Sequence, residues 1–424
     1  MENKRTTLVL FIMIILDFIG FSLIFPLVPD LLIFYFSNPI YTLDRILINT
    51  FKNINQYFTN YKIENLILLM GTLLGSMYSF LQFLFSPFWG RLSDRVGRKK
   101  ALLLTNLGIA ISYLIWLFSF SFSFFILSRI LNGIMAGNLG VISAYFSDVS
   151  KEENRTKSMG ILGMGIGLGF IFGPVFGGIF YYSGKILFQK FPILKEIYHP
   201  FYLCSLGSFL LSTISVILNV LFLQEEKQSK KTEQKISFFS MKSHLKKITF
   251  FNFIYMLVFT SFEFTFTFYY KFKFLLNPTQ IGFVFLYMGA FVALSQGIVP
   301  RYLSSKISEI RMIQTGTFLI SFTFVFQIFT NNLVLSLLGL VPIALGNSLV
   351  QPAIYSYASK ISDQNHIGYI LGSLRSMASF SRAISPIMGG IIYWLYGYQI
   401  AYSIFFIIVL IIFLISISIW KNYN

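Results

Sequence analysis

Twelve long apolar stretches constrain this 424-residue chain more than any other feature of its sequence. Each has about the 20 residues that an α-helix needs to cross the hydrocarbon core of a bilayer. Only 12% of the residues are charged, roughly half the share in a soluble domain. We therefore predict an all-α integral membrane protein with twelve transmembrane helices. The predicted spans lie near 8–29, 66–89, 101–120, 124–146, 158–181, 201–223, 249–270, 280–300, 312–329, 332–357, 367–393 and 399–420.

A compact charged turn, residues 90–100, joins the second and third spans. Lys and Arg are retained on the cytoplasmic side of a membrane, so we expect this turn and both termini to be cytoplasmic. Gly90 and Gly97 are expected to permit a tight reversal. Asp94 is suited to capping a helix N-terminus or to holding an arginine such as Arg95 or Arg98. The net charge of +17 follows the same asymmetry across the membrane, so nucleic acid is not an expected partner.

The polar, lysine-rich stretch 224–248 predicts a cytoplasmic linker between two six-helix bundles, 1–223 and 249–424. The two halves also resemble each other, because a Pro-x-x-Gly-Gly motif recurs in the fifth and eleventh spans at one offset. The first copy is Pro174, Gly177 and Gly178, and the second is Pro386, Gly389 and Gly390. Repeated halves around a midplane site are the usual plan of a secondary transporter, so we expect two pseudo-symmetric bundles.

Two outer loops are longer than the other connections. The first, 31–64, is rich in Asn, Tyr and Phe, and part of it (43–60) is expected to form an amphipathic helix on the outer surface. The second covers 183–200.

Several function classes are not expected. Cys204 is the single cysteine, so neither an intramolecular disulfide nor a cysteine-based metal site can form. The three histidines fall in or beside predicted loops, and the chain has no phosphate-binding Gly-Lys-Ser/Thr loop. We therefore expect no metal, no cofactor and no enzymatic activity.

Four motifs resemble one family of transporters. Gly90-x-Leu-x-Asp-Arg-x-Gly-Arg-Lys is similar to the loop motif of the major facilitator superfamily. Gly169-x-x-x-Gly173-Pro174-x-x-Gly177-Gly178 resembles the fifth-helix motif of its drug:proton antiporters, and Leu127-x-Arg129 resembles their fourth-helix motif. The first two spans resemble those of tetracycline exporters. The resemblance implies a monomeric transporter in the cell (inner or plasma) membrane that exchanges small molecules for protons. The third and ninth spans carry no acid, however, which separates the chain from the tetracycline exporters themselves.

The few ionisable groups within spans are the first candidates for chemistry, because such groups are costly at membrane depth. Asp17 and Arg129 are expected at similar depth, where they form either a coupling pair or a permanent structural bridge. Glu263 stands alone among phenylalanines, as a proton carrier or as a neutral, hydrogen-bonded acid. Arg382 contacts an anionic substrate, pairs with one of the acids, or holds carbonyls freed near Pro386.

Uncharged groups and glycines complete the predicted path. Four amides line a cavity or cross-link helices: Gln82, Gln296, Asn347 and Gln351. Arg375 is expected in a cytoplasmic gate with Asp94, unless it reaches lipid headgroups instead. Four glycines give the fifth span a smooth face for close packing or gating: Gly165, Gly167, Gly169 and Gly173.

The sequence thus favours a secondary exporter of small amphipathic or drug-like compounds, driven by inward proton flow through two rocking bundles. A metabolite uniporter or symporter on the same fold, carrying an organic anion, is the alternative. A sensor without transport activity comes third. The expected partners are the substrate, protons and the lipid bilayer.

Overall fold

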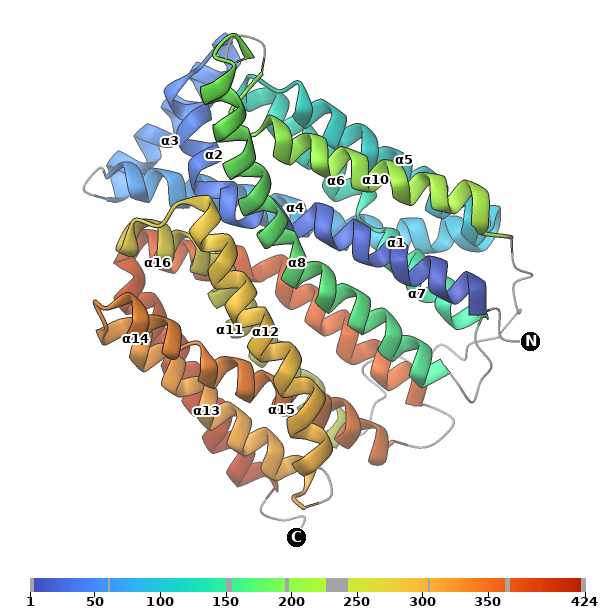
Figure 1. The fold of residues 1–424 in the computed structure, drawn as a ribbon. Coiled ribbons are helices and arrows are strands. Elements are labelled where there is room, and N and C mark those ends of the chain that lie inside the picture. Colours follow the sequence, from blue (N-terminus) through green and yellow to red (C-terminus); the bar gives the residue numbers. More distant parts are fainter. Residues whose placement is uncertain are drawn as a thin grey trace. The chain divides into compact units, whose positions relative to one another are not determined.

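The computed structural model describes residues 4–59, 62–149, 155–194, 198–225, 243–303, 306–362 and 367–420 (Figure 1). Within these ranges the chain is almost entirely helical and contains no strand, which confirms the predicted all-α membrane fold. Helices dominate because a backbone in lipid must pair its polar groups within its own segment.

Contacts divide the chain into two compact units, each described here by itself. Unit 1 comprises Met1–Lys231 and Tyr270–Leu286, and unit 2 comprises Thr232–Tyr269 and Tyr287–Asn424. The predicted boundaries at 223 and 249 stay a prediction, because residues 226–242 of the linker lie outside the described residues.

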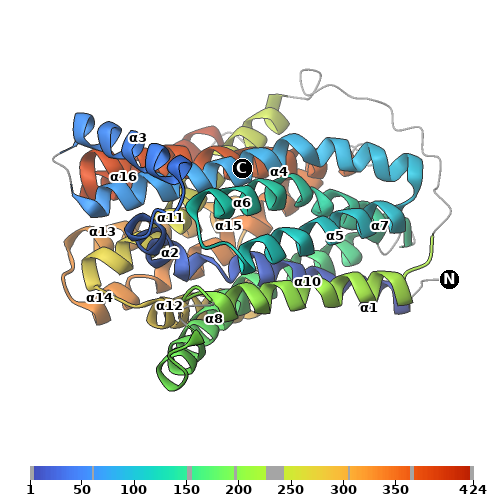
Figure 2. The ribbon, with the colours of Figure 1, turned by 90° about the horizontal axis from the view of Figure 1, so that it is seen from above.

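The helices of unit 1 run from α1 to α10, with α5 and α10 packed side by side (Figures 1 and 2). Their bounds are α1 Lys4–Ser22, η1 Phe25–Leu27, α2 Val28–Ser37, α3 Thr42–Phe58, α4 Ile63–Val96, α5 Arg98–Leu117, α6 Phe122–Met135, α7 Asn138–Val149, α8 Arg155–Lys190 and α10 Tyr202–Phe222.

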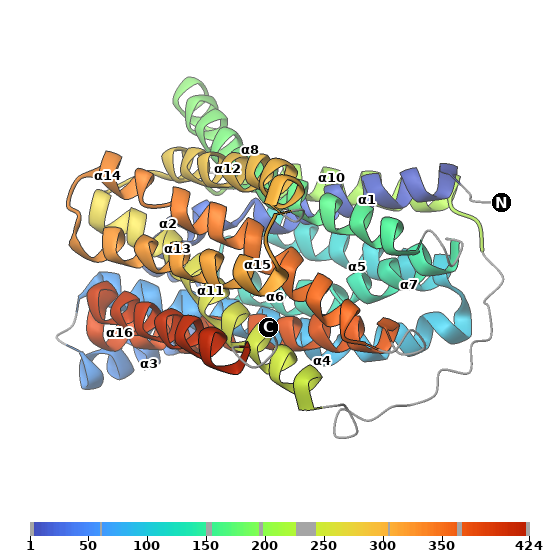
Figure 3. The same cartoon turned by 90° about the horizontal axis from the view of Figure 1, so that it is seen from below.

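Unit 2 is built around α13, which packs against both α15 and α16 (Figure 3). The remaining bounds are α11 Ser243–Phe274, α12 Pro278–Leu303, α13 Glu309–Phe329, α14 Leu333–Leu338, α15 Val341–Lys360 and α16 Ile367–Trp420. The ends of α11 and α12, joined through residues 275–277, group with unit 1.

The number of spans agrees with the prediction once one break is recognised. Eleven described segments are long and apolar enough to cross a membrane, and the last of them covers Ile370–Ile417. This segment is two helices joined at Gly397, whose φ of 80° and ψ of 169° are not helical. Glycine adopts a positive φ at little cost, so the chain turns there between the eleventh and twelfth spans.

Both predicted outer loops are shorter than expected, because helices run further than the apolar stretches alone indicated. The first span does not end at residue 29: η1 interrupts it at Pro26, and α2 continues to Ser37 with Leu31 and Tyr35 fully buried. Similarly, α8 extends to Lys190 and buries Phe188. The amphipathic helix predicted at 43–60 is present as α3.

A glycine stripe on α8 lets α1 approach closely. A Cβ atom at Gly173 would lie 2.8 Å from the Ile19 carbonyl oxygen, and one at Gly169 would lie 3.1 Å from the Phe18 backbone. Gly165 and Gly177 face α1 in the same way. These four residues repeat every fourth position, which keeps them on one helix face. Gly167, which we expected on this face, points to open space instead.

The corresponding helix pair of unit 2, α11 and α16, is joined through serines. Ser381 and Ser385 stand 212 residues after Gly169 and Gly173. Ser381 Oγ donates to the Phe253 carbonyl oxygen at 2.8 Å, and Ser261 Oγ donates to the Ser385 carbonyl oxygen at 3.1 Å. Gly389, the repeat of Gly177, keeps the close approach: its Cβ would lie 3.1 Å from the Ser261 carbonyl oxygen. In unit 1 a hydroxyl bond, from Ser22 Oγ to the Gly169 carbonyl oxygen at 3.0 Å, accompanies the bare glycines, whereas in unit 2 serines replace two of the glycines and both helices donate hydroxyl bonds.

Candidate functional site

Asp17 of α1 lies beside a chain of neutral polar groups contributed by three other helices of unit 1. Its Oδ2 accepts a hydrogen bond from Asn138 Nδ2 of α7 at 2.9 Å. The same nitrogen lies 3.2 Å from Asn106 Oδ1 of α5, and Asn106 Nδ2 donates to Ser215 Oγ of α10 at 3.1 Å. Ser215 in turn hydrogen-bonds Asp17. Asp17 Oδ1 is buried and has no hydrogen-bond partner among the described residues. The carboxyl group is therefore held in place without a cation.

Arg129 is enclosed by aromatic rings of α5 and α6. Its guanidinium carbon lies 5.0 Å from the ring centroid of Trp116 and 5.5 Å from those of Tyr113 and Phe125, within the range of cation–π attraction. Nη2 donates to Ser128 Oγ at 2.9 Å, whereas Nε is buried without a partner in the part of the chain that the structure describes. Only 8% of the residue surface is exposed.

The expected Asp17–Arg129 ion pair does not form within the described residues. Asp17 contacts Asn138, which lies nine residues beyond Arg129 in the same span. Arg129 lies in α6 and Asn138 in α7, on either side of the helix break at residues 136–137. Each of the two charges is held by neutral neighbours.

Glu263, in unit 2, adjoins an aromatic cluster of α11, α13 and α16. The ring of Phe262 packs 5.5 Å from those of Phe324 and Tyr402, and the neighbouring Glu263 is half-buried. Arg382 of α16 acts on it electrostatically, but no ion pair within 4.0 Å joins them in the described structure. The Arg382 guanidinium is exposed and donates from Nη2 to Ser379 Oγ at 3.2 Å.

Asp17 and Glu263 are not repeat equivalents. Leu23, directly after α1, and Ser261 of α11 occupy corresponding places, since the Leu23 carbonyl oxygen faces Gly177 and the Ser261 carbonyl oxygen faces its repeat, Gly389. Asp17 comes six residues before Leu23, whereas Glu263 comes two residues after Ser261. The acids therefore lie about two helical turns apart in depth within their own units.

Three of the four predicted amides cross-link helices. Gln82 Nε2 donates to the Ala136 carbonyl oxygen at 3.1 Å, Asn347 Oδ1 accepts from the Tyr255 hydroxyl at 2.6 Å, and Gln351 Nε2 lies 2.8 Å from Met256 Sδ. Gln296 is exposed.

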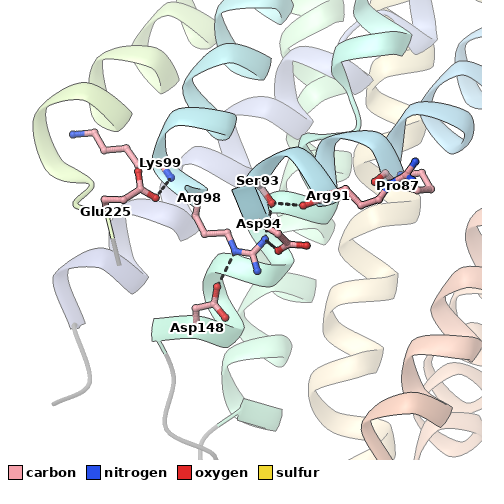
Figure 4. Close-up of polar contacts among 9 residues, drawn as sticks. Pro87, Arg91, Ser93, Asp94, Arg98, Lys99, Asp148 and Glu225 are labelled. Carbon is pink, nitrogen blue, oxygen red and sulfur yellow. Dashed lines mark hydrogen bonds and ion pairs between the residues drawn. The ribbon is translucent and has the colours of Figure 1, made fainter. Parts of the chain in front are cut away.

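The charged turn, residues 90–100, is organised by Arg98 (Figure 4). Its guanidinium pairs with Asp94 at 2.6 Å and with Asp148 of α7 at 2.8 Å, and it donates to Ser93 Oγ at 2.6 Å. Asp94 lies in the last turn of α4, so it holds an arginine and does not cap an N-terminus. Arg95 is exposed.

The reversal depends on one glycine and not on two. Gly97 has a φ of 101° between the end of α4 and the start of α5, whereas Gly90 lies inside α4 with open space beside it. The expectation that both glycines turn the chain was wrong for Gly90, because the helix continues through it. Arg375, the expected partner of Asp94, is exposed on α16, and a joint gate stays a prediction.

The beginning of the linker docks on this turn. Glu225 Oε1 accepts a hydrogen bond from the Lys99 backbone N–H at 3.3 Å (Figure 4), and the Tyr145 hydroxyl donates to the Gln224 carbonyl oxygen. A Cβ atom at Gly97 would collide with the Glu225 carboxyl group. Nothing in the spacing of the sequence indicated this contact.

Other polar contacts were also missed by reading the sequence. Lys271 Nζ pairs with Asp30 Oδ1 at 2.7 Å within unit 1. His199 is buried, accepts from the Phe201 N–H at Nδ1 and lies 3.1 Å from the Trp116 carbonyl oxygen through Nε2. The described residues contain no group of three or more His, Cys, Asp or Glu side chains that could hold a metal ion.

Comparison with known proteins identifies the family. The sequence matches the Major Facilitator Superfamily over residues 10–386, and again over 248–422. The chain belongs to this superfamily.

Relatives match it over nearly its whole length. It is 26% identical to mouse major facilitator superfamily domain-containing protein 10 over 438 residues, covering 99% of this chain and 93% of that protein. It is 28% identical to the class H tetracycline resistance protein of Pasteurella multocida, covering 94% and 91%. The crystal structure of the human organic anion transporter MFSD10 has a TM-score of 0.73 at 24% identity, covering 98% of this chain and all of that one. The protein is therefore a multi-pass membrane transporter and not an enzyme.

Proposed function

We propose that the protein exports small amphipathic or drug-like compounds in exchange for protons. The observation that carries this proposal is the setting of Asp17, whose partners are neutral amide and hydroxyl groups and whose Oδ1 is free of hydrogen bonds in the described structure. Such a carboxyl group can bind and release a proton without breaking an ion pair. Glu263 offers a second carboxyl group that could bind a proton, at another depth. The similarity to tetracycline resistance proteins of classes H and B supports export.

We further propose that the protein works as a monomer in the cell membrane, with both termini cytoplasmic and with two bundles that rock about a midplane path. In this mechanism the Asp94–Arg98–Asp148 contacts hold the charged turn in one state. An Asp94→Asn variant that transports at the unchanged rate would contradict this role.

The test is proton movement in proteoliposomes containing purified protein and a pH-sensitive dye in the lumen. Cationic and neutral drugs are added to acid-loaded vesicles, and Asp17→Asn and Glu263→Gln are compared with the parent protein. We expect drug-triggered proton release from the parent and its loss in at least one variant. Glu64→Gln is the matched control, because Glu64 is an exposed acid in the first turn of α4. Substrate flux without proton movement would refute antiport.

Organic anion transport is the second candidate, and Arg129 favours it. A buried guanidinium with no acid within ion-pair distance in the described chain, and with a free Nε, lacks the counter-charge that buried cations usually have. An anionic substrate would supply that counter-charge, and MFSD10 is described as an organic anion transporter.

The two candidates are separated by measuring uptake of a fluorescent organic anion into the same vesicles. Anion flux in the parent that falls at least tenfold in Arg129→Met, and partly recovers in Arg129→Lys, would favour anion transport. Drug-driven proton release with no anion flux would favour the exporter.

A further inference from the structure

The amphipathic helix α3 has three distinct faces. Four apolar side chains form one of them, and all four are exposed, Tyr57 by 84% of its surface. The set is Leu43, Ile46, Ile54 and Tyr57. Leu43 and Ile54 are eleven residues apart, and so are Ile46 and Tyr57. Eleven residues make about three turns of an α-helix, so the members of each pair lie on the same side. We call this set the apolar stripe.

A second face of α3 is bonded to the rest of unit 1. Its members, Asp44, Ile48 and Asn55, are buried, and their spacings of four and seven residues keep them on one side of the helix. Asp44 Oδ1 accepts from the Ser123 backbone N–H at 2.9 Å and from Ser123 Oγ at 2.5 Å, while Oδ2 accepts from the Tyr41 N–H at 3.0 Å. Burial alone would raise the pKa of Asp44, but these hydrogen bonds outweigh it and lower the pKa below its usual value. The carboxylate therefore binds the N-terminal turns of both α3 and α6, which prevents α3 from rotating.

The third face is polar. Arg45, Asn49 and Gln56 are exposed. Their spacings of four and seven residues keep them on one side of the helix, and Lys52 lies on the same side. Contact of this polar face with water and of the apolar stripe with lipid would solvate both faces favourably.

Both ends of α3 are tied to the ends of spans at one membrane surface. Ser123 is the second residue of α6, and Asn55 Nδ2 donates at 3.4 Å to the carbonyl oxygen of Lys62, which directly precedes α4. A single span, Arg5–Ser37, separates α3 from the N-terminus, and α3 lies at the opposite end of unit 1 from the N-terminus (Figure 1). The helix therefore runs along the membrane surface opposite the N-terminus.

From this geometry we infer that α3 is an interfacial helix whose apolar stripe binds phospholipid. The stripe enters the boundary between acyl chains and headgroups, where Tyr57 suits the mixed environment. Arg45 and Lys52 lie on the polar face, away from the stripe, where they can meet water and anionic headgroups. The spans cross the bilayer, whereas α3 orients unit 1 at its surface. This inference does not depend on the transported substrate.

Site-directed spin labelling tests it. Cys204 is the single cysteine and is buried, so Cys204→Ser gives a clean background. Single cysteines replace Ile46 and Ile54 on the stripe, and Asn49 and Gln56 on the polar face serve as matched controls. The labelled proteins are reconstituted in vesicles of phosphatidylcholine and phosphatidylglycerol, and collision rates with oxygen and with a water-soluble nickel chelate are measured.

We expect the ratio of the oxygen collision rate to the nickel-chelate collision rate to be severalfold higher for labels at 46 and 54 than for labels at 49 and 56. Equal access of the nickel chelate to all four positions would overturn the inference. Dipolar broadening between labels at 46, lost when labelled protein is diluted with unlabelled protein, would also overturn it, because a second copy would then cover the stripe.

Discussion

At the scale of single residues, two buried charges of the first unit, Asp17 and Arg129, are held by neutral neighbours. Asp17 is bonded by the Asn138 amide and the Ser215 hydroxyl, and Arg129 by aromatic faces and Ser128. A buried charge without a counter-charge is unfavourable, and for this reason we propose that both residues take up a partner during function. The proposed proton and anion sites are therefore separate, and variants of one residue should not mimic variants of the other.

His199 predicts a pH dependence of stability. Burial lowers its pKa from 6.5 to about 4, against a smaller opposing effect of the Trp116 and Leu117 carbonyl groups. The unfolded chain thus binds a proton near pH 6.5 and the folded chain only near pH 4, so stability is complete above pH 6.5 and falls as the pH drops to 4. The expected loss is about 3 kcal/mol. His199→Gln should flatten this dependence in thermal unfolding followed by tryptophan fluorescence.

His244→Gln is the control for this experiment, since His244 lies at the exposed start of α11. An unchanged slope between pH 6.5 and 4 in His199→Gln would show that other groups govern the acid response.

Gly97 and Gly90 predict opposite outcomes for the same substitution. Gly97→Ala places a Cβ at a φ of 101° and against Glu225, so we expect a loss of about 1 to 3 kcal/mol and slower transport. Gly90→Ala adds a methyl group to open space inside a helix and should leave the unfolding temperature unchanged or raised. Equal destabilisation by both substitutions would contradict the assignment of the reversal to Gly97.

At the scale of elements, the same helix pairing occurs twice with a different balance of contacts. The α1–α8 contact combines four glycines, Gly165, Gly169, Gly173 and Gly177, with a hydroxyl bond from Ser22. The α11–α16 contact depends on hydroxyl–carbonyl bonds of Ser261, Ser381 and Ser385. Small residues allow backbones in a membrane to approach closely, and serines can add hydrogen bonds there. The glycine stripe of α8 packs against α1, the helix that carries Asp17, so this packing helps to position the carboxyl group.

Gly173 predicts a packing defect that Gly167 does not. In Gly173→Ala, the new methyl group meets the Ile19 and Leu23 backbones at 2.8 and 3.0 Å, so we expect a loss of about 1 to 3 kcal/mol. Gly167→Ala faces open space and should be neutral or more stable by up to about 1 kcal/mol. The measurement is the temperature at which the buried Cys204 thiol becomes reactive. A similar decrease of this temperature in both variants would argue against close packing through the glycine stripe of α8.

At the scale of the whole molecule, part of the second sequence half belongs to unit 1. Tyr270–Leu286 groups with the first helices, through the Lys271–Asp30 ion pair and a 3.0 Å bond from Thr279 Oγ1 to the Gly178 carbonyl oxygen. The linker is then not the sole connection between the two sequence halves.

Halves expressed as separate chains, 1–231 and 232–424, are therefore expected to copurify from detergent. Lys271→Glu should reduce the recovered complex severalfold, because it replaces the ion pair with a repulsion, whereas Lys306→Glu, outside this contact, should not. Halves that never copurify would show that Tyr270–Leu286 does not hold them together.

The sequence by itself determined the membrane class, the twelve spans, the charged turn and the repeated Pro-x-x-Gly-Gly, because burial in lipid and tight turns impose local residue patterns. The position of α3 could also be predicted from its alternation of apolar and polar residues. The tertiary structure alone decided the partners of Asp17 and Arg129, the separate roles of Gly90 and Gly97, and the docking of Glu225. Those contacts depend on the depth and rotation of each helix against its neighbours, which side-chain packing sets and which no local pattern encodes.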